Sequence, residues 1–333
     1  MTKLTKFAIV ELNSQTDILA NLQSIEVGIK IASERGTRMV ILPENAFCFG
    51  KQVFASQYFD ALKDWSAQAA RHYSVYLLAG TLPCPYRPDG TPVADGKLRQ
   101  SSLLFDPAGD CLARYDKIHL FKATVNDSTG NYDEGRTFEA GNALIVADTE
   151  FGKVGMMVCF DIRFPTLAVK LREIGADIFT APSAFTYQTG KAHWHALLTA
   201  RALDSQCMVI GAGQTGDHVV NPSEPGKVRS TWGHSEFISS HGESVLTQTI
   251  DAVTRDFDIT NNLDDLPLSA KAANWLPKSD GRQQLDQTAV KPTPSQQAPT
   301  VIFADFDADA QQITRQNIAL LECQKLTIIA NNI

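Results

Sequence analysis

Short apolar runs alternate with amphipathic helical segments along most of this chain, and this alternation constrains the fold more than any other feature. Residues 6–12 form an apolar run, and residues 16–35 follow with apolar side chains at helical spacing. Gly36 ends that helix, and residues 39–42 form a second apolar run. Strands that alternate with helices predict a layered α/β or α+β fold, in which helices cover the faces of a sheet.

The same alternation continues to about residue 250. Further helices are predicted over residues 58–73, from Pro165 onward, and over residues 191–204. Further strands are predicted over residues 75–80, 154–159, 178–181 and 208–211. Two hairpins are predicted, one over residues 101–117 and one over residues 233–250 that turns at His241-Gly242.

Residues 251–300 break this pattern. Five of the chain's fifteen prolines lie between residues 261 and 300. Because proline interrupts helices and strands, we expect a Pro/Gln-rich, partly irregular insertion at the surface. Two interpretations stay open: a floppy connection without a role, and a lid or dimer arm. A last strand and a helix are expected over residues 301–333.

The composition argues against several classes of protein. With 37 acidic and 30 basic residues the net charge is −7, which disfavours a general nucleic-acid binder. The chain has no apolar run of the length that spans a membrane, and its N-terminus lacks the features of a signal peptide. The six cysteines show no Cys-x-x-Cys pair, and the seven histidines show no metal-ligand spacing. We therefore expect a cytoplasmic protein without a metal, a cofactor, a nucleic-acid partner or a membrane partner.

Three reactive side chains are expected at strand ends. Glu44 and Lys117 each come directly after a predicted strand, and Cys159 lies between a strand and the helix that starts at Pro165. A cysteine on such a turn is presented as a nucleophile elbow presents a serine, and nearby helix amides would favour its thiolate. Taken singly, each residue is more often a surface charge or a buried thiol. Together they supply a base, an electrophilic stabiliser and a nucleophile, the set that acyl transfer needs.

Three segments also carry a family resemblance, namely residues 42–45 (LPEN), 115–121 (YDKIHLF) and 159–165 (CFDIRFP). In order and spacing they resemble the three signatures of the nitrilase superfamily of carbon–nitrogen hydrolases. Residues 182–185, 192–194, 201–203 and 232–235 agree further with its Nit amidase branch. The resemblance implies a four-layer α-β-β-α sandwich, one carbon–nitrogen hydrolase domain over residues 1–333, and a homodimer or higher homo-oligomer.

The resemblance also implies roles for single residues. Glu44 would be the general base, and Cys159 would be the nucleophile that forms a thioester. Lys117 and the backbone N–H of Phe160 would stabilise the oxyanion. Glu134 would be the second glutamate that many relatives carry after the lysine.

The implied substrate is the terminal amide of a small carboxylate, of the deaminated glutathione or 2-oxoglutaramate type, cleaved to acid and ammonia. A carboxylated substrate needs a cation in the pocket, and Arg163 is the candidate. The alternative for Arg163 is an ion pair with Asp161 or with the sheet edge. Phe185 and His193 would line the pocket by family position, whereas Trp194 is expected in the core.

Some features depart from the branch and leave the substrate open. His195 stands where relatives usually have Glu, Glu11 stands where Gln is common, and the Pro-rich residues 251–300 replace what is usually a tight connection. Glu139 is a weaker candidate than Glu134 for the second glutamate. A nitrilase or N-carbamoyl-amide hydrolase with the same Glu-Lys-Cys triad is one alternative. A catalytically idle binding or scaffold protein is another.

Overall fold

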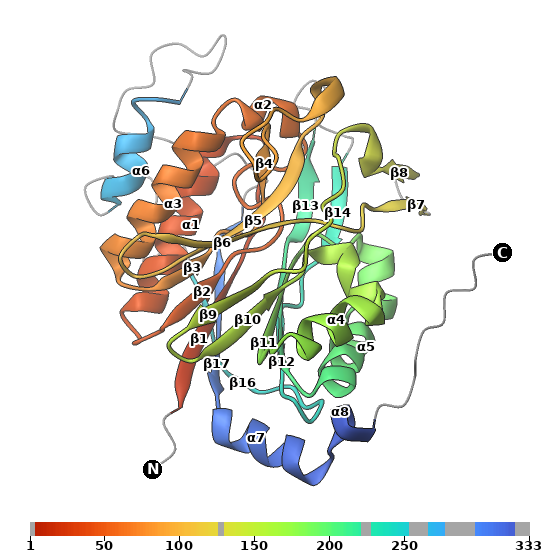
Figure 1. The fold of residues 1–333 in the computed structure, drawn as a ribbon. Helices are drawn as coiled ribbons and strands as arrows, with labels where there is room; N and C mark the ends of the chain where they lie inside the picture. Colours follow the sequence, from red (N-terminus) through yellow and green to blue (C-terminus); the bar gives the residue numbers. More distant parts are fainter. Residues whose placement is uncertain (1–3, 126–129, 221–227, 253–265, 277–296, 324–333) are drawn as a thin grey trace, which may run out of the picture.

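The computed structural model describes residues 4–125, 130–220, 228–252, 266–276 and 297–323. Two β-sheets form the centre of the molecule (Figure 1). The eight-stranded sheet contains β1 (Thr5–Glu11), β2 (Met39–Ile41), β3 (Tyr76–Leu78), β4 (Leu82–Cys84), β5 (Arg99–Phe105), β6 (Cys111–Asp116), β16 (Leu246–Asp251) and β17 (Thr300–Phe306). The five-stranded sheet contains β9 (Val146–Thr149), β10 (Gly152–Met156), β11 (Ile178–Ser183), β12 (Met208–Gly213) and β15 (Glu236–Ile238).

Helices cover the outer faces of the two sheets (Figure 1). On the larger sheet lie α1 (Ile18–Ser33), α3 (Phe59–Tyr73) and α6 (Pro267–Ala272), and on the smaller sheet lie α4 (Pro165–Glu173) and α5 (Tyr187–Ser205). Shorter elements are α2 (Gln52–Ser56), α7 (Ala308–Asn317), α8 (Leu320–Cys323) and the 3₁₀ turns η1 (Ala94–Gly96), η2 (Glu134–Arg136) and η3 (Cys159–Arg163). The expected four-layer sandwich is confirmed.

Successive side chains of β1 point to opposite faces of the larger sheet, and this explains why its apolar run is continuous. Phe7 and Ile9 belong to the core cluster that also holds Val154 of the smaller sheet. Ala8 and Val10 point the other way and join the cluster formed with α1 and α3. Because successive residues of a strand face opposite sides, a strand buried on both faces has to be apolar at every position.

One sequence prediction is confirmed only around its turn. In the hairpin predicted over residues 233–250, the chain turns tightly at Ser239, which accepts the backbone N–H of Gly242 at 2.9 Å, and Ile238 and Ser244 form an antiparallel bridge. β15 pairs with β12 in the smaller sheet, whereas β16 pairs with β17 in the larger one. Two strands joined by a short turn show the same sequence pattern whether they pair with each other or belong to different sheets.

Two hairpins were not expected from the sequence. The first consists of β7 (Lys122–Thr124) and β8 (Asn131–Asp133), and the second of β13 (Thr215–Val219) and β14 (Val228–Trp232). Their strands are rich in polar residues, so they lack the apolar runs that mark the other strands. The predicted hairpin over residues 101–117 is confirmed, since β5 and β6 pair antiparallel.

The insertion at residues 251–300 is described only in part, because residues 253–265 and 277–296 lie outside the described residues. Its described helix α6 packs on α1, where the backbone N–H groups of Leu268 and Ser269 donate to the Glu26 carboxylate at 3.1 and 2.7 Å. A role as a lid or dimer arm stays a prediction. Within the described part of the chain, no helix combines the length and apolar character that crossing a membrane requires.

Candidate active site

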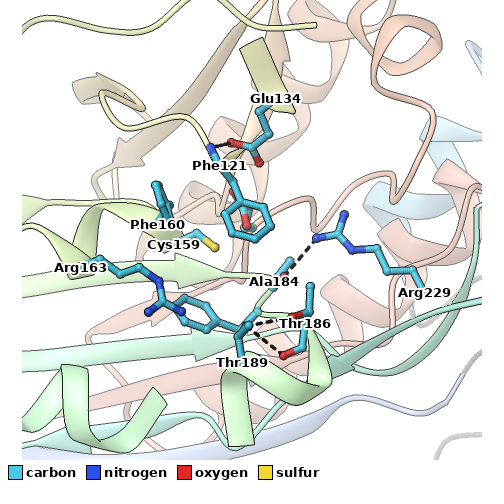
Figure 2. A pocket seen from close by; sticks show the side chains of 11 residues that line it. Phe121, Glu134, Cys159, Phe160, Arg163, Ala184, Thr186, Thr189 and Arg229 are labelled. Carbon is cyan, nitrogen blue, oxygen red and sulfur yellow. Dashed lines mark hydrogen bonds between the residues drawn. The ribbon is translucent and has the colours of Figure 1, made fainter. Parts of the chain in front are cut away.

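A pocket lies where the carboxyl ends of β2, β10 and β11 meet (Figure 2). Ligands of α/β folds commonly bind at this edge of a sheet. The lining residues are Glu44, Phe121, Glu134, Cys159, Phe160, Arg163, Ala184, Phe185, Thr186, Thr189 and Arg229. The strand-end residues Glu44 and Cys159, expected as reactive from the sequence, therefore share one cavity.

Cys159 occupies a turn with an unusual backbone. The strand β10 ends at Met156, and Cys159 begins the 3₁₀ turn η3 with a φ of 49°. Residues other than glycine rarely adopt a positive φ, and those that do concentrate at functional sites. The side chain is 8% exposed, so the thiol reaches the pocket while the rest of the residue is covered.

Asp161 holds this turn against the end of β6. Its buried carboxylate accepts the backbone N–H of Val158 at 2.9 Å and the hydroxyl of Tyr115 at 2.7 Å. It also lies 2.7 Å from Nδ1 of His119, whose backbone N–H donates to it at 3.0 Å. Asp161 therefore joins the segment that carries Lys117 to the segment that carries Cys159, and the alternative of an ion pair between Asp161 and Arg163 is wrong.

Lys117 is a buried cation between two carboxylates. Its Nζ lies 2.8 Å from Glu44 and 2.8 Å from Glu134. Burial alone would lower the pKa of Lys117, but the charges of Glu134 and Glu44 outweigh burial and raise this pKa well above its ordinary value. Lys117 therefore stays protonated beside Cys159. Glu134 is held in turn by the backbone N–H of Phe121, which donates to it at 2.7 Å.

The turn before Glu44 is fixed by close packing. A side chain at Gly80 would place its Cβ 2.0 Å from the carbonyl oxygen of Pro43, so only glycine fits beside this turn. The carbonyl oxygen of Glu44 also accepts the side-chain amide of Gln214 at 3.1 Å. Glu139, the weaker candidate for the second glutamate, lies outside the pocket and pairs with Arg87 at 2.8 Å.

The expectation of a thiolate at Cys159 is wrong for the free protein. Burial raises the pKa of the Cys159 thiol well above its ordinary range, the charge of Glu44 raises it further, and Lys117 opposes this only in part. A thiol that is neutral at pH 7 needs a base to become a nucleophile. The carboxylate of Glu44 lines the same pocket and can accept that proton.

Arg163 lies between two aromatic rings at one end of the pocket. Its guanidinium carbon is 5.1 Å from the ring centre of Phe185 and 5.9 Å from that of Phe160. His193 contacts Arg163 at 3.3 Å but is not among the lining residues. The expected core position of Trp194 is confirmed, since it is 1% exposed and donates from Nε1 to the carbonyl of His234 at 2.8 Å.

Part of the pocket was not predicted from the sequence. Arg229, Phe121, Thr186 and Thr189 all line it. Arg229 belongs to β14, a strand without an apolar run, so no periodic signal marked it. Among the described residues, no group of three or more His, Cys, Asp or Glu side chains is arranged to hold a metal ion.

Comparisons with known proteins agree with this geometry. A family model described as carbon-nitrogen hydrolase matches residues 6–255. A deaminated glutathione amidase of Yersinia enterocolitica is 39% identical over 76% of this chain and 85% of its own length. The crystal structure of the C. elegans NitFhit protein matches with 25% identity and a TM-score of 0.71, over 97% of this chain and 66% of that longer one. The structure of Saccharomyces cerevisiae Nit3 shares the fold at 22% identity and a TM-score of 0.66, over 96% of this chain and 95% of that one.

The Tyr115 hydroxyl generates a first prediction. Tyr115→Phe removes the donor to Asp161 and the acceptor that Ile118 N–H uses at 3.3 Å. We expect the free energy of unfolding in urea to fall by about 1–3 kcal/mol, the range for a buried hydrogen bond to a charged group. Tyr58→Phe is the control, because the Tyr58 hydroxyl has no hydrogen bond to a described residue. Equal stability of the two variants would contradict the role of Asp161.

The raised pKa of Cys159 generates a second prediction. Since the neutral thiol dominates at pH 7, the thiolate fraction grows with pH. The rate at which methyl methanethiosulfonate modifies Cys159 should therefore rise about tenfold per pH unit up to about pH 9. Peptide-resolved mass spectrometry measures this rate, and Cys159→Ala gives the background. A rate that levels off below about pH 8 would show that the thiolate already forms in the free protein.

Proposed function

The chain belongs to the carbon–nitrogen hydrolase family, and we propose that it hydrolyses a linear amide of a small carboxylic acid through a thioester on Cys159. The observation that carries this proposal is the placement of a buried thiol on a strained turn, in one pocket with Glu44 and beside the Glu44–Lys117 ion pair at 2.8 Å. Splitting amide hydrolysis into two acyl transfers lowers each barrier.

The first step forms the thioester. Glu44 accepts the proton of the Cys159 thiol as the sulfur attacks the amide carbon. The negative charge that develops on the carbonyl oxygen is stabilised by Lys117 and by the backbone N–H of Phe160, and one such donor supplies about 3 kcal/mol. When the carbon–nitrogen bond breaks, Glu44 returns the proton to the nitrogen. A primary amide releases ammonia, and a substituted amide releases the corresponding amine.

The second step hydrolyses the thioester. Glu44 accepts a proton from water, the hydroxide attacks the acyl carbon, and the carbon–sulfur bond breaks as Glu44 returns that proton to the sulfur and so restores the thiol. Glu134 does not exchange protons in this scheme. It holds Lys117 at 2.8 Å, in addition to Glu44, and so keeps the ammonium group directed at the reacting oxygen.

The acid part of the substrate is bound by Arg163. Its position beside Cys159 in the pocket and between the rings of Phe160 and Phe185 supports this role. The resemblance to a deaminated glutathione amidase at 39% identity favours a substrate of the deaminated glutathione type, with 2-oxoglutaramate as the second choice. His193 lies behind Arg163 and positions it.

We further propose a cytoplasmic enzyme that forms a homodimer or a higher homo-oligomer and works without a cofactor. The six cysteines, all free of disulfides, support a reducing compartment. The resemblance to the Nit branch supports the assembly.

The proposed function predicts that turnover requires the thiol of Cys159. Turnover is measured on a panel of substrates that contains deaminated glutathione, 2-oxoglutaramate, an aliphatic amide and an aliphatic nitrile. We expect acid to form from a carboxylated amide, and Cys159→Ala to lower that rate about a thousandfold or more. Hydroxylamine should divert the acyl group of the wild-type thioester to a hydroxamate.

Cys207→Ala is the matched control, because Cys207 is a fully buried thiol outside the pocket. Its rate should stay within about threefold of the wild type. Turnover of the nitrile alone would favour the nitrilase alternative, and full activity of Cys159→Ala would overturn the proposed mechanism.

A further inference from the structure

The pocket contains a second arginine that the proposed reaction does not use. Arg229 lies on β14, and Arg163 lies at the end of η3. Both line the pocket, and Figure 2 shows the sulfur of Cys159 between their guanidinium groups. A molecule whose reacting carbon sits at this sulfur therefore extends toward a cation on either side.

Arg229 is held in place by aromatic rings. Its guanidinium carbon lies 5.0 Å from the ring centre of Phe49 and 4.9 Å from that of Tyr132, distances typical of cation–π contacts. The Phe49 ring stacks in turn on the ring of His218 at 3.8 Å. Burial lowers the pKa of His218 to about 3, so His218 is neutral at pH 7 and does not repel the arginine. The guanidinium group is thus positioned before a ligand arrives.

The charge of Arg229 has no carboxylate partner among the described residues. The two acidic residues of the pocket, Glu44 and Glu134, are both paired with Lys117. Arg229 donates one hydrogen bond, from Nη2 to the carbonyl of Ala184 at 3.3 Å. Its Nε is buried and has no hydrogen-bond partner within the described part of the chain. A guanidinium group offers five donors, so most of them remain for an anion.

We propose that Arg229 binds a carboxylate on the amine part of the substrate, while Arg163 binds a carboxylate on the acyl part. This inference rests on the proposed function and narrows it. The preferred substrate is then a substituted amide with an acidic group on each side of the bond that is cleaved. In the step concerned, the sulfur–carbon bond forms, the carbon–nitrogen bond breaks, and Glu44 gives its proton to the nitrogen. The product that leaves past Arg229 is a carboxylated amine.

Three substrates separate this inference from its alternatives. Deaminated glutathione has a carboxylate on each side of the amide. The derivative of deaminated glutathione whose C-terminal carboxylate is converted to an amide lacks the carboxylate on the amine part. In 2-oxoglutaramate the amine part is only the nitrogen of the primary amide. All three yield 2-oxoglutarate, so one assay measures kcat/KM for each.

We expect Arg229→Gln to lower kcat/KM for deaminated glutathione about 10- to 100-fold, the loss expected for one hydrogen-bonded ion pair. The values for the other two substrates should change less than about threefold, because they do not reach Arg229 with a charge. Arg229→Lys keeps the positive charge but lacks the planar donors, so its kcat/KM for deaminated glutathione should lie between those of the wild type and Arg229→Gln. Arg172→Gln is the matched control, since Arg172 is half-buried, has an Nε without a described partner, and lies outside the pocket.

The outcomes are distinct. If Arg229→Gln lowered kcat/KM equally for all three substrates, the inference would be overturned. Arg229 would then act by holding the backbone carbonyl of Ala184 in place. An unchanged kcat/KM for deaminated glutathione in Arg229→Gln would also overturn it. A wild-type protein that forms 2-oxoglutarate from none of the three would overturn the proposed substrate class, and this inference with it. Activity with 2-oxoglutaramate alone would leave the proposed function standing and overturn only the role of Arg229.

Discussion

The buried ion cluster of Lys117, Glu44 and Glu134 is the interaction on which the site depends. A buried ammonium group is costly unless opposite charges and hydrogen bonds compensate for lost water, and here two carboxylates lie at 2.8 Å. Glu44 follows β2, Lys117 follows β6 and Glu134 begins η2, so the cluster forms only when these two strands of the larger sheet and the turn η2 are in place. Cys159 comes from the smaller sheet, and Asp161 connects the two halves by bonding to Tyr115.

This arrangement separates the position of the nucleophile from its activation. The turn at Cys159 is fixed by Asp161, whereas burial and the charge of Glu44 keep the thiol protonated. The same carboxylate that disfavours the thiolate is the group that can accept its proton. In the proposed mechanism the sulfur therefore becomes reactive when a carbonyl carbon is present to take up the charge, and Lys117 is the cation that stabilises the oxygen.

The sequence predicts the parts of this site that lie at the ends of apolar strands. Glu44, Lys117 and Cys159 could be placed because strands buried on both faces are visible as continuous apolar runs. Arg229 could not, because β14 is short and polar and its strand partner is β13, outside the two large sheets. The protonation of Cys159 could not either, since it depends on burial and on charges from distant segments. The strands after Gly233 were assigned to a hairpin because pattern alone does not identify a partner strand.

The two pocket arginines belong to different structural units, and this has a consequence for specificity. Arg163 lies on the same 3₁₀ turn as Cys159, so the group proposed to hold the acid and the group proposed to attack the carbon are fixed together. Arg229 lies on a separate hairpin and is held by Phe49 and Tyr132, which touch neither Cys159 nor Lys117 in any ring or hydrogen-bond contact of the described residues. In the proposed scheme the amine part of a substrate is therefore contacted by a different structural unit from the one that carries the nucleophile, and Ala184, which accepts from Arg229 and hydrogen-bonds to Cys159, connects the two.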